Sequence, residues 1–266
     1  MMRSLWISKT GLDAQQSNLD TISNNLANVS TTAFKRVRPV FEDLMYQNLR
    51  EPGLSEGNGN WVPAGLQAGN GSRIAATVRI NTAGAMVHSD NPLDLAISGN
   101  GFFMLGSPAN PQTVSYSRTG NFQRNSDGNI VNNSGMLLLD QNGNPMKIDS
   151  TATSIEVAND GTISYYTKDT LTPTVLTKIA IRTFVNPTGL ATSGAGTYTE
   201  TLASGPPQVG IAGQNGFGAI TQYYTEQSNV NVAEELVSLI AAQRAYEITA
   251  KSVTASDQML QKLGQL

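Results

Sequence analysis

Cysteine is absent from the 266 residues of this chain, and histidine occurs once, as His88. Without cysteine the chain forms neither disulfides nor thiolate metal sites, and a single histidine excludes a histidine-rich metal site. Charge is also scarce, because 14% of the residues are charged and the net charge is −3. The chain therefore lacks the basic field with which many proteins bind nucleic acid.

Long apolar runs are missing as well. No run approaches the roughly 18–20 residues that a helix needs to cross a bilayer, which argues against an integral membrane protein. Residues 1–11 carry Arg3 and Lys9 and lack the apolar core and cleavage site of a secretory signal. If the protein leaves the cytoplasm, we expect it to leave without a cleaved signal peptide.

What the sequence does contain is an amphipathic pattern at each end. Residues 231–266 predict one long helix, because Asn231 can cap it and Glu234 follows three residues later, as a capping box requires. Apolar residues with mostly three- and four-residue spacing form one stripe along this helix. The stripe consists of Val232, Leu236, Leu239, Tyr246, Ala250, Val253, Leu260 and Leu263.

Residues 4–29 predict a second amphipathic helix, in which leucine recurs every seven residues and two further apolar residues fill the interleaved positions of its later half. Asparagine crowds its end, although asparagine is a poor helix former. These amides either face water or bond to neighbouring elements, and the pattern favours neither alternative. The residues concerned are Leu5, Leu12, Leu19, Leu26, Ile22 and Val29, with Asn24, Asn25 and Asn28.

Residues 30–62 read as a connecting region. Lys35, Arg36 and Arg38 are expected to form a solvated basic patch, given the acidic chain around them. Apolar residues in 40–49 fall on one face of a short helix, whereas glycine, proline and asparagine in 51–62 predict a loop.

Residues 66–224 have the pattern of β structure. Turn signals recur at Asp127-Gly128, Asn142-Gly143 and Asp160-Gly161, with short apolar or β-branched runs between them. Residues 93–105 predict a pair of strands bent around Gly99 and Gly101. No helical pattern alternates with these strands, so the sheet is expected to be antiparallel and the fold α+β. Residues 189–218 give no clear register.

No catalytic constellation is evident. His88, Ser89 and Asp90 are adjacent, whereas a nucleophilic triad converges from separate segments, so this tripeptide reads as a turn. The glycine-containing segments 99–101 and 194–196 lack the residues that complete dinucleotide or phosphate loops. We predict no catalytic, cofactor-binding or metal-binding residues, although a carboxylate pair assembled in three dimensions would escape this reasoning.

Several segments resemble the bacterial flagellar axial proteins, which comprise rod, hook and hook-associated subunits. Residues 23–36 (SNNLANVSTTAFKR) resemble the N-terminal signature of that family. Residues 228–236 (SNVNVAEEL) and 243–247 (QRAYE) resemble its C-terminal signature. The segments that resemble the distal rod branch are 41–47 (FEDLMYQ), 50–53 (REPG), 65–67 (GLQ), 93–103 and 116–122.

The resemblance implies a structural subunit that self-assembles helically into the rigid tubular drive shaft between flagellar motor and hook. It implies that the terminal helices pair as a coiled coil, with an inserted antiparallel β domain outside. The implied partners are copies of the chain, proximal rod and hook proteins, and the surrounding wall and outer-membrane rings. The implied location is the basal body, where the rod spans the periplasm after type III export. The expected domains are 1–35 with 229–266 (helical), 36–70 (linker) and 71–228 (outer β domain).

Two groups of residues follow from this resemblance. The expected assembly interface contains Leu5, Leu12, Leu19, Ile22, Asn25, Leu26, Asn28, Val29, Val232, Leu236, Leu239, Tyr246, Val253, Leu260 and Leu263. The segment expected to make the rod rigid contains Tyr46, Arg50, Pro52, Gly53, Trp61 and Pro63. The alternatives are a hook or proximal rod subunit of the same family, or a β-rich protein that binds or hydrolyses cell-wall polymer.

Overall fold

The computed structural model describes residues 2–50, 64–108, 110, 113–167 and 170–264. The chain divides into two compact units. The helical unit contains Met1–Ala27, Val37–Arg79 and Asn231–Leu266, and the β unit contains Asn28–Arg36 and Ile80–Val230. The chain therefore passes between the units four times.

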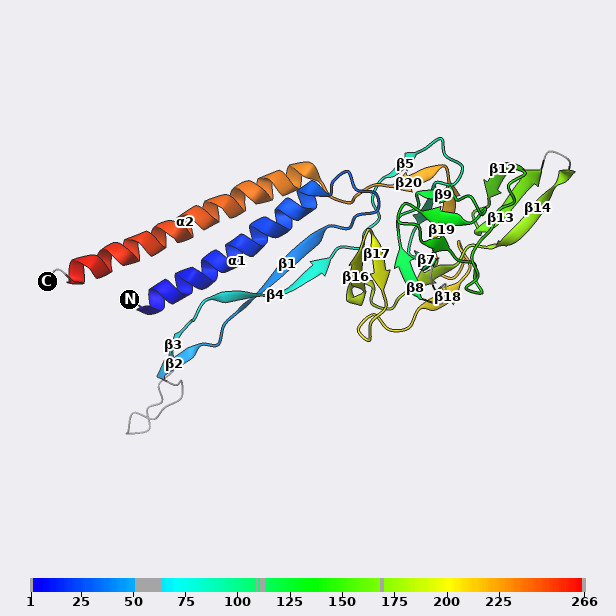
Figure 1. Ribbon diagram of the computed structural model, residues 1–266. Helices are drawn as coiled ribbons and strands as arrows, with labels where there is room; N and C mark the ends of the chain where they lie inside the picture. Colours follow the sequence, from blue (N-terminus) through cyan, green and yellow to red (C-terminus); the bar gives the residue numbers. More distant parts are fainter. Residues whose placement is uncertain (1, 51–63, 109, 111–112, 168–169, 265–266) are drawn as a thin grey trace. The chain divides into compact units, whose positions relative to one another are not determined.

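Two long helices dominate the helical unit. Helix α1 spans Met2–Ala27 and helix α2 spans Val232–Gly264, so both predicted terminal helices are confirmed. They lie side by side and antiparallel, with the two chain termini at the same end of the pair (Figure 1). Asn231 caps α2 as expected, because its side-chain oxygen accepts from the Ala233 N–H at 3.0 Å.

Two β-ribbons complete the helical unit. Strand β1 (Val37–Asp43) pairs with β4 (Ser72–Arg79), and β2 (Gln47–Arg50) pairs with β3 (Leu66–Ala68), both antiparallel. The short helix predicted in 40–49 is therefore wrong. Local spacing suggested that helix, but the β-branched residues of 72–79 supply a distant strand partner that local spacing cannot reveal.

The β unit is antiparallel throughout its described pairings, as predicted. Its largest sheet has the order β16-β17-β8-β7-β11-β10-β9, with β15 against β7 and β18 against β15. These strands are β7 (Phe102–Gly106), β8 (Val114–Ser117), β9 (Phe122–Arg124), β10 (Ile130–Asn132), β11 (Leu137–Leu138), β15 (Ile181–Thr183), β16 (Ala191–Gly194), β17 (Thr197–Thr199) and β18 (Gln208–Gly210).

Three smaller sheets accompany the largest sheet. Strands β12 (Ala152–Val157), β13 (Thr162–Thr167) and β14 (Thr170–Lys178) form a meander. Strand β19 (Ala219–Gln222) pairs with β6 (Leu95–Ser98), and β20 (Tyr224–Glu226) pairs with β5 (Met86–His88). A 3₁₀ turn, η1 (Pro187–Gly189), precedes β16.

Strand β7 lies between two hydrophobic cores. Phe103 and Leu105 belong to the larger core, whereas Phe102 and Met104 belong to the smaller one. Because successive side chains of a strand point to opposite faces, a strand buried on both faces reads as a continuous apolar run. Edge-to-face contact between Phe103 and Phe122, whose ring centroids are 5.3 Å apart, adds to the larger core.

The predicted turns are confirmed. Gly128, Gly143 and Gly161 all have φ near +84°, a conformation that glycine adopts without strain. The two strands predicted in 93–105 are confirmed as β6 and β7, but they do not pair with each other, because β6 pairs with β19 whereas β7 pairs with β8, β11 and β15. Gly101, at φ 148°, permits this divergence, since a Cβ there would lie 2.6 Å from Ile181.

Candidate assembly interface

The seam between α1 and α2 is built from small and polar side chains. Ser8 and Ser252 approach to 3.5 Å between their hydroxyl oxygens, and a Cβ on Gly11 would lie 3.4 Å from the Thr249 methyl group. Ala14 and Ala242 are also buried. Small residues allow two helices to approach closely, but they bury little apolar area.

Asn25 anchors the seam at the end where α1 stops. Its side-chain N–H donates to the Val37 carbonyl at 2.8 Å and to the Glu235 carboxylate at 3.3 Å, and its oxygen accepts from the Val37 N–H at 2.9 Å. Asn25 is buried, and so is Glu235 on α2. The first alternative for this amide, contact with water, is therefore wrong, and the second is confirmed.

The residues predicted for the assembly interface differ in how far they are buried in the single chain. Ile22 and Asn25 are buried, whereas the leucines of α1 and their neighbours are half-buried. On α2, Val232, Leu236 and Tyr246 are exposed, and the side chain of Leu263 lies outside the described residues. The half-buried residues are Leu5, Leu12, Leu19, Leu26, Asn28, Val29, Leu239, Val253 and Leu260.

The outward-facing surface of α2 is unusually apolar. Val237, Ile248 and Met259 are more than half exposed, and their eleven-residue spacing, about three helix turns, places them on one side. Leu236 and Ile240 form a second exposed pair four residues apart. A helix of a self-contained domain normally turns such residues toward its core.

The exposed apolar surface extends to the rest of the helical unit. Among the described residues, 22 large apolar side chains are exposed, and 16 of them belong to this unit. Only three of the 31 buried apolar residues do so, namely Ala14, Ile22 and Ala242. The members outside α2 are Trp6, Ile7, Val40, Phe41, Met45, Tyr46, Leu49, Leu66 and Ile74.

The segment predicted to confer rigidity is only partly described. Tyr46 is exposed, and its ring lies 3.5 Å from the Cβ position of Gly69. Arg50 closes strand β2 opposite Leu66. The remaining predicted residues, Pro52, Gly53, Trp61 and Pro63, lie outside the described residues.

In the β unit, Glu226 lies at the centre of a buried ion cluster. One carboxylate oxygen lies 2.5 Å from the Lys35 ammonium and the other 2.7 Å from the Arg118 guanidinium. The side chains of all three are at most 5% exposed. The expectation that Lys35 is part of a solvated patch is therefore wrong, because Glu226, 191 residues away, draws it into the interior.

The single Glu226 carboxylate pairs with both cations of this cluster. Burial lowers the pKa of Lys35, and the neighbouring Glu226 only partly opposes that shift. Burial alone would raise the pKa of Glu226, but the charges and hydrogen bonds of Arg118 and Lys35 outweigh it and hold the pKa below the ordinary value. Arg118 also donates to the carbonyls of Ile97, Gly99 and Gly101 at 2.6–3.0 Å.

Asn229 joins the same chain segments through backbone contacts. Its oxygen accepts from the Arg36 N–H at 2.7 Å, and its N–H group donates to the carbonyls of Ile80 and Thr82. Together with the Lys35–Glu226 pair, Asn229 fixes the places where the chain enters and leaves the β unit. Sequence analysis did not predict the roles of Arg118, Glu226 and Asn229. The positions of Lys35 and Asn229 within the two terminal signatures were the signal that could have indicated them.

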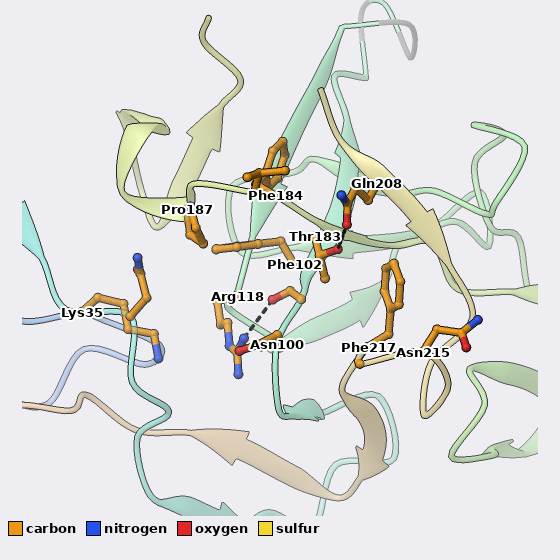
Figure 2. A pocket seen from close by; sticks show the side chains of 14 residues that line it. Lys35, Asn100, Phe102, Arg118, Thr183, Phe184, Pro187, Gln208, Asn215 and Phe217 are labelled. Carbon is orange, nitrogen blue, oxygen red and sulfur yellow. Dashed lines mark hydrogen bonds between the residues drawn. The ribbon is translucent and has the colours of Figure 1, made fainter. Parts of the chain in front are cut away.

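A cleft of about 380 Å³ opens beside this cluster. The buried rings of Phe102 and Phe184 line it together with Pro187 and Phe217 (Figure 2). Phe217 can take its position because residue 210 is glycine, since a Cβ there would lie 2.2–2.5 Å from the ring. None of the described residues that line the cleft carries a carboxylate.

A second, shallow groove bears on the hydrolytic alternative, because Asp127 and Asp149 both line it. Asp149 is exposed and accepts a hydrogen bond from the Thr151 N–H at 3.2 Å, which lowers its pKa. A general acid needs a raised pKa, so Asp149 is unsuited to that role. No helix among the described residues is long and apolar enough to span a membrane.

Three family models match the chain. "Flagella basal body rod protein" covers residues 6–35, "Flagellar hook protein FlgE/F/G D1 domain" covers 96–165, and "Flagellar basal body rod FlgEFG protein C-terminal" covers 221–266. The first and last models include most of the two terminal signatures.

Relatives match over the whole length. The flagellar basal-body rod protein FlgG of Buchnera aphidicola from Acyrthosiphon pisum is 49% identical over 100% of both chains. The proteins of the same name from Borreliella burgdorferi and Bacillus subtilis are 40% and 34% identical, over 98% and 99% of this chain and 97% and 98% of their own.

Proposed function

The chain belongs to the flagellar basal-body rod protein FlgG family, and from this membership we propose that it is a structural subunit of the distal rod. Copies assemble helically into the rigid tubular shaft that carries torque from the motor to the hook. The relatives are named as a rod protein, which is a structural component and not an enzyme.

The single observation that carries this proposal is the exposed apolar surface of the helical unit. Among the described residues of this unit, 16 large apolar side chains are exposed, whereas three apolar residues are buried. Head-to-tail contacts between identical copies repeat without closing and would cover that surface along a helix of subunits. The residues predicted for the assembly interface, such as Val232 and Leu236, fit this role better than a role inside one chain.

The architecture of the assembled shaft follows as part of the proposal. The terminal helical domain, 1–35 with 229–266, pairs as a coiled coil and lines the inner wall, while 71–228 forms the outer layer. Residues 36–70 link the two, and the segment that contains Tyr46, Arg50, Pro52, Gly53, Trp61 and Pro63 bridges neighbouring copies.

The remaining partners follow from the same proposal. Proximal rod and hook proteins continue the shaft at its two ends, and wall and outer-membrane rings surround it. The rod spans the periplasm in the basal body, after export without a cleaved signal peptide.

Leu236→Asp tests the proposal directly. The side chain is already 42% exposed in the single chain, so we expect the β unit to melt at an unchanged temperature. Burying the new charge between copies costs several kcal/mol, which should abolish rod assembly. Leu236→Met keeps the apolar surface and is the matched control. Normal rods from Leu236→Asp would contradict the assignment of this surface.

A hook or proximal rod subunit is the second candidate, because two of the matching family models cover FlgE and FlgF as well as FlgG. Removing residues 51–61 and measuring polymer bending by electron microscopy separates the candidates. A distal rod subunit should give a more flexible shaft after the deletion, whereas unchanged bending would favour the alternative.

A further inference from the structure

Asn-Gly steps are the places where a protein chain most readily modifies itself. The glycine nitrogen attacks the side-chain carbonyl of the asparagine, and glycine has no Cβ to hinder that approach. The sequence contains five such steps, of which the structure describes four. Glycine follows asparagine in each, so the sequence alone predicts similar reactivity, and a difference among the steps comes from the fold. They begin at Asn70, Asn100, Asn142 and Asn215, and at Asn58, which lies outside the described residues.

The step Asn215-Gly216 lies at the centre of an exposed turn between β18 and β19. Phe217 closes this turn, because its N–H donates to the Gln214 carbonyl at 2.9 Å. Asn215 has φ 51° and Gly216 has φ 84°, the two positive angles that a type I′ turn requires. Both residues are exposed, and a Cβ on Gly216 would meet no described atom within 4 Å. Water and hydroxide therefore reach this step.

The two reacting groups of this step make no hydrogen bond within the described part of the chain. The Gly216 N–H is a central amide of the turn, and a β-turn bonds only its two outer residues. The Asn215 side chain points away from the Arg118 guanidinium (Figure 2). The amide therefore approaches the Gly216 nitrogen without first breaking a hydrogen bond.

Hydrogen bonds restrain two of the other described steps. At Asn70 the side-chain N–H donates to the Met45 carbonyl at 2.7 Å, which holds the amide in place. At Asn142 the attacking nitrogen itself is bonded, because the Gly143 N–H donates to the Asp140 carbonyl at 3.0 Å. Breaking one hydrogen bond first slows the attack by about 2- to 10-fold.

Packing restrains the step at Asn100. Its backbone carbonyl accepts from the Gly218 N–H at 2.7 Å, and the following Gly101 is buried. A Cβ on Gly101 would lie 2.6 Å from a core side chain, so the close-packed backbone resists the rotation that brings nitrogen and carbonyl together. Among the described steps, Asn215-Gly216 alone has both of its residues exposed and both reacting groups unrestrained.

We propose that Asn215-Gly216 is a site of spontaneous deamidation in the folded chain. The Gly216 nitrogen forms a bond to the side-chain carbonyl carbon of Asn215, the bond from that carbon to the amide nitrogen breaks, and ammonia leaves with the displaced proton. Water then opens the resulting succinimide ring at either carbonyl and yields aspartate or isoaspartate. The reaction needs water alone as co-reactant, and the inference is independent of the proposed rod function.

Both products change the cleft of the β unit, because Asn215 belongs to its lining. Either product adds a carboxylate to a lining whose described residues include Lys35 and Arg118 and no acid. Isoaspartate also adds a methylene to the main chain, which lengthens the turn that holds the Phe217 ring against Gly210. Deamidation therefore alters both the charge and the shape of the cleft.

The experiment incubates the purified full-length chain in mildly alkaline buffer and samples it over time. Peptide mass mapping measures the conversion of amide to acid at each asparagine, and isoaspartyl methyltransferase with a labelled methyl donor detects isoaspartate. We expect conversion at Asn215 to be about 2- to 10-fold faster than at Asn70 or Asn142. In concentrated urea, where the fold is lost, the three steps should convert at similar rates.

Asn215→Gln is the matched control, because it keeps a side-chain amide but requires a larger ring, which forms more slowly. It should abolish conversion at position 215 and leave the rates at Asn70 and Asn142 unchanged. Equal rates at Asn215 and Asn142 in the folded chain would overturn the inference. A lead of Asn215 that persists in urea would overturn it as well, because the fold would then not be the cause.

Discussion

The two units differ in where their apolar side chains lie. Among the described residues, the β unit has 28 buried apolar residues and six exposed large apolar residues, whereas the helical unit has three buried and 16 exposed. The β unit thus has the interior of a self-contained domain, with fully buried Phe103, Phe122 and Leu138 at its centre. The helical unit has long helices but a seam of small and polar residues. The helical unit therefore exposes the apolar surface that the proposed assembly would cover, whereas the β unit has the buried core of a self-contained domain.

The largest difference between the units should appear when the free energies of unfolding of Phe103→Ala and Trp6→Ala are compared. Phe103 is fully buried, so its truncation should lower the free energy of unfolding by about 4 kcal/mol. Trp6 is 56% exposed, so the same truncation should change monomer stability little. Urea denaturation followed by circular dichroism measures both. Equal losses of unfolding free energy in the two variants would contradict the difference between the units.

Glu226→Gln should be the next largest effect, because it leaves two buried cations without a full counter-charge. We expect a loss of about 3 kcal/mol at neutral pH. Folding lowers the pKa of Glu226, so its stabilisation is complete above the ordinary carboxyl pKa of 4.5 and is lost as pH falls through the folded value. Stability of the variant, measured by urea denaturation, should therefore fall less between pH 5 and acid than that of the native chain.

Asp160→Asn is the matched control for that experiment. Asp160 pairs with Lys178 at 2.8 Å, and this hydrogen bond lowers the pKa of Asp160 to about 2. Both side chains are more than one third exposed, so solvent screening limits the loss to about 0–1 kcal/mol. An equal loss in the two variants would show that burial of the Glu226 cluster contributes nothing.

Asn25→Ala should have a smaller effect than Glu226→Gln, and that effect should be confined to the helical unit. It removes both hydrogen bonds to Val37 and the one to Glu235, at a cost of about 1–2 kcal/mol. Hydrogen exchange at the Val37 amide should rise while exchange in β7 stays unchanged. Faster exchange in both units would show that they are not separate in stability.

Much of the fold could be predicted from short-range sequence signals. The caps and spacing of the two terminal helices and the turns at Gly128, Gly143 and Gly161 are short-range signals, and the structure confirms them. The strand pairing of 37–43 with 72–79 is long-range, so a helix was predicted in its place. The partners of β6 and β7 were missed for the same reason.

The candidate site was predicted less well. The apolar stripe of α2 was identified, but periodicity cannot say whether a stripe meets its own chain or another copy, and Leu236 is exposed here. The position of Lys35 was predicted wrongly because its partner, Glu226, is remote in sequence. The resemblance of the terminal signatures identified the family without revealing that the signatures are tied together by Glu226 and Asn229.

Hydrogen exchange measured on the purified monomer and on assembled rods tests the central claim most directly. We predict that amides of α1 and α2 exchange quickly in the monomer and become protected in the rod, while the β7 and β11 amides are protected in both. Proteolysis should follow the same division, with the chain ends cut first in the monomer. Helices α1 and α2 as strongly protected in the monomer as β7 would contradict the account.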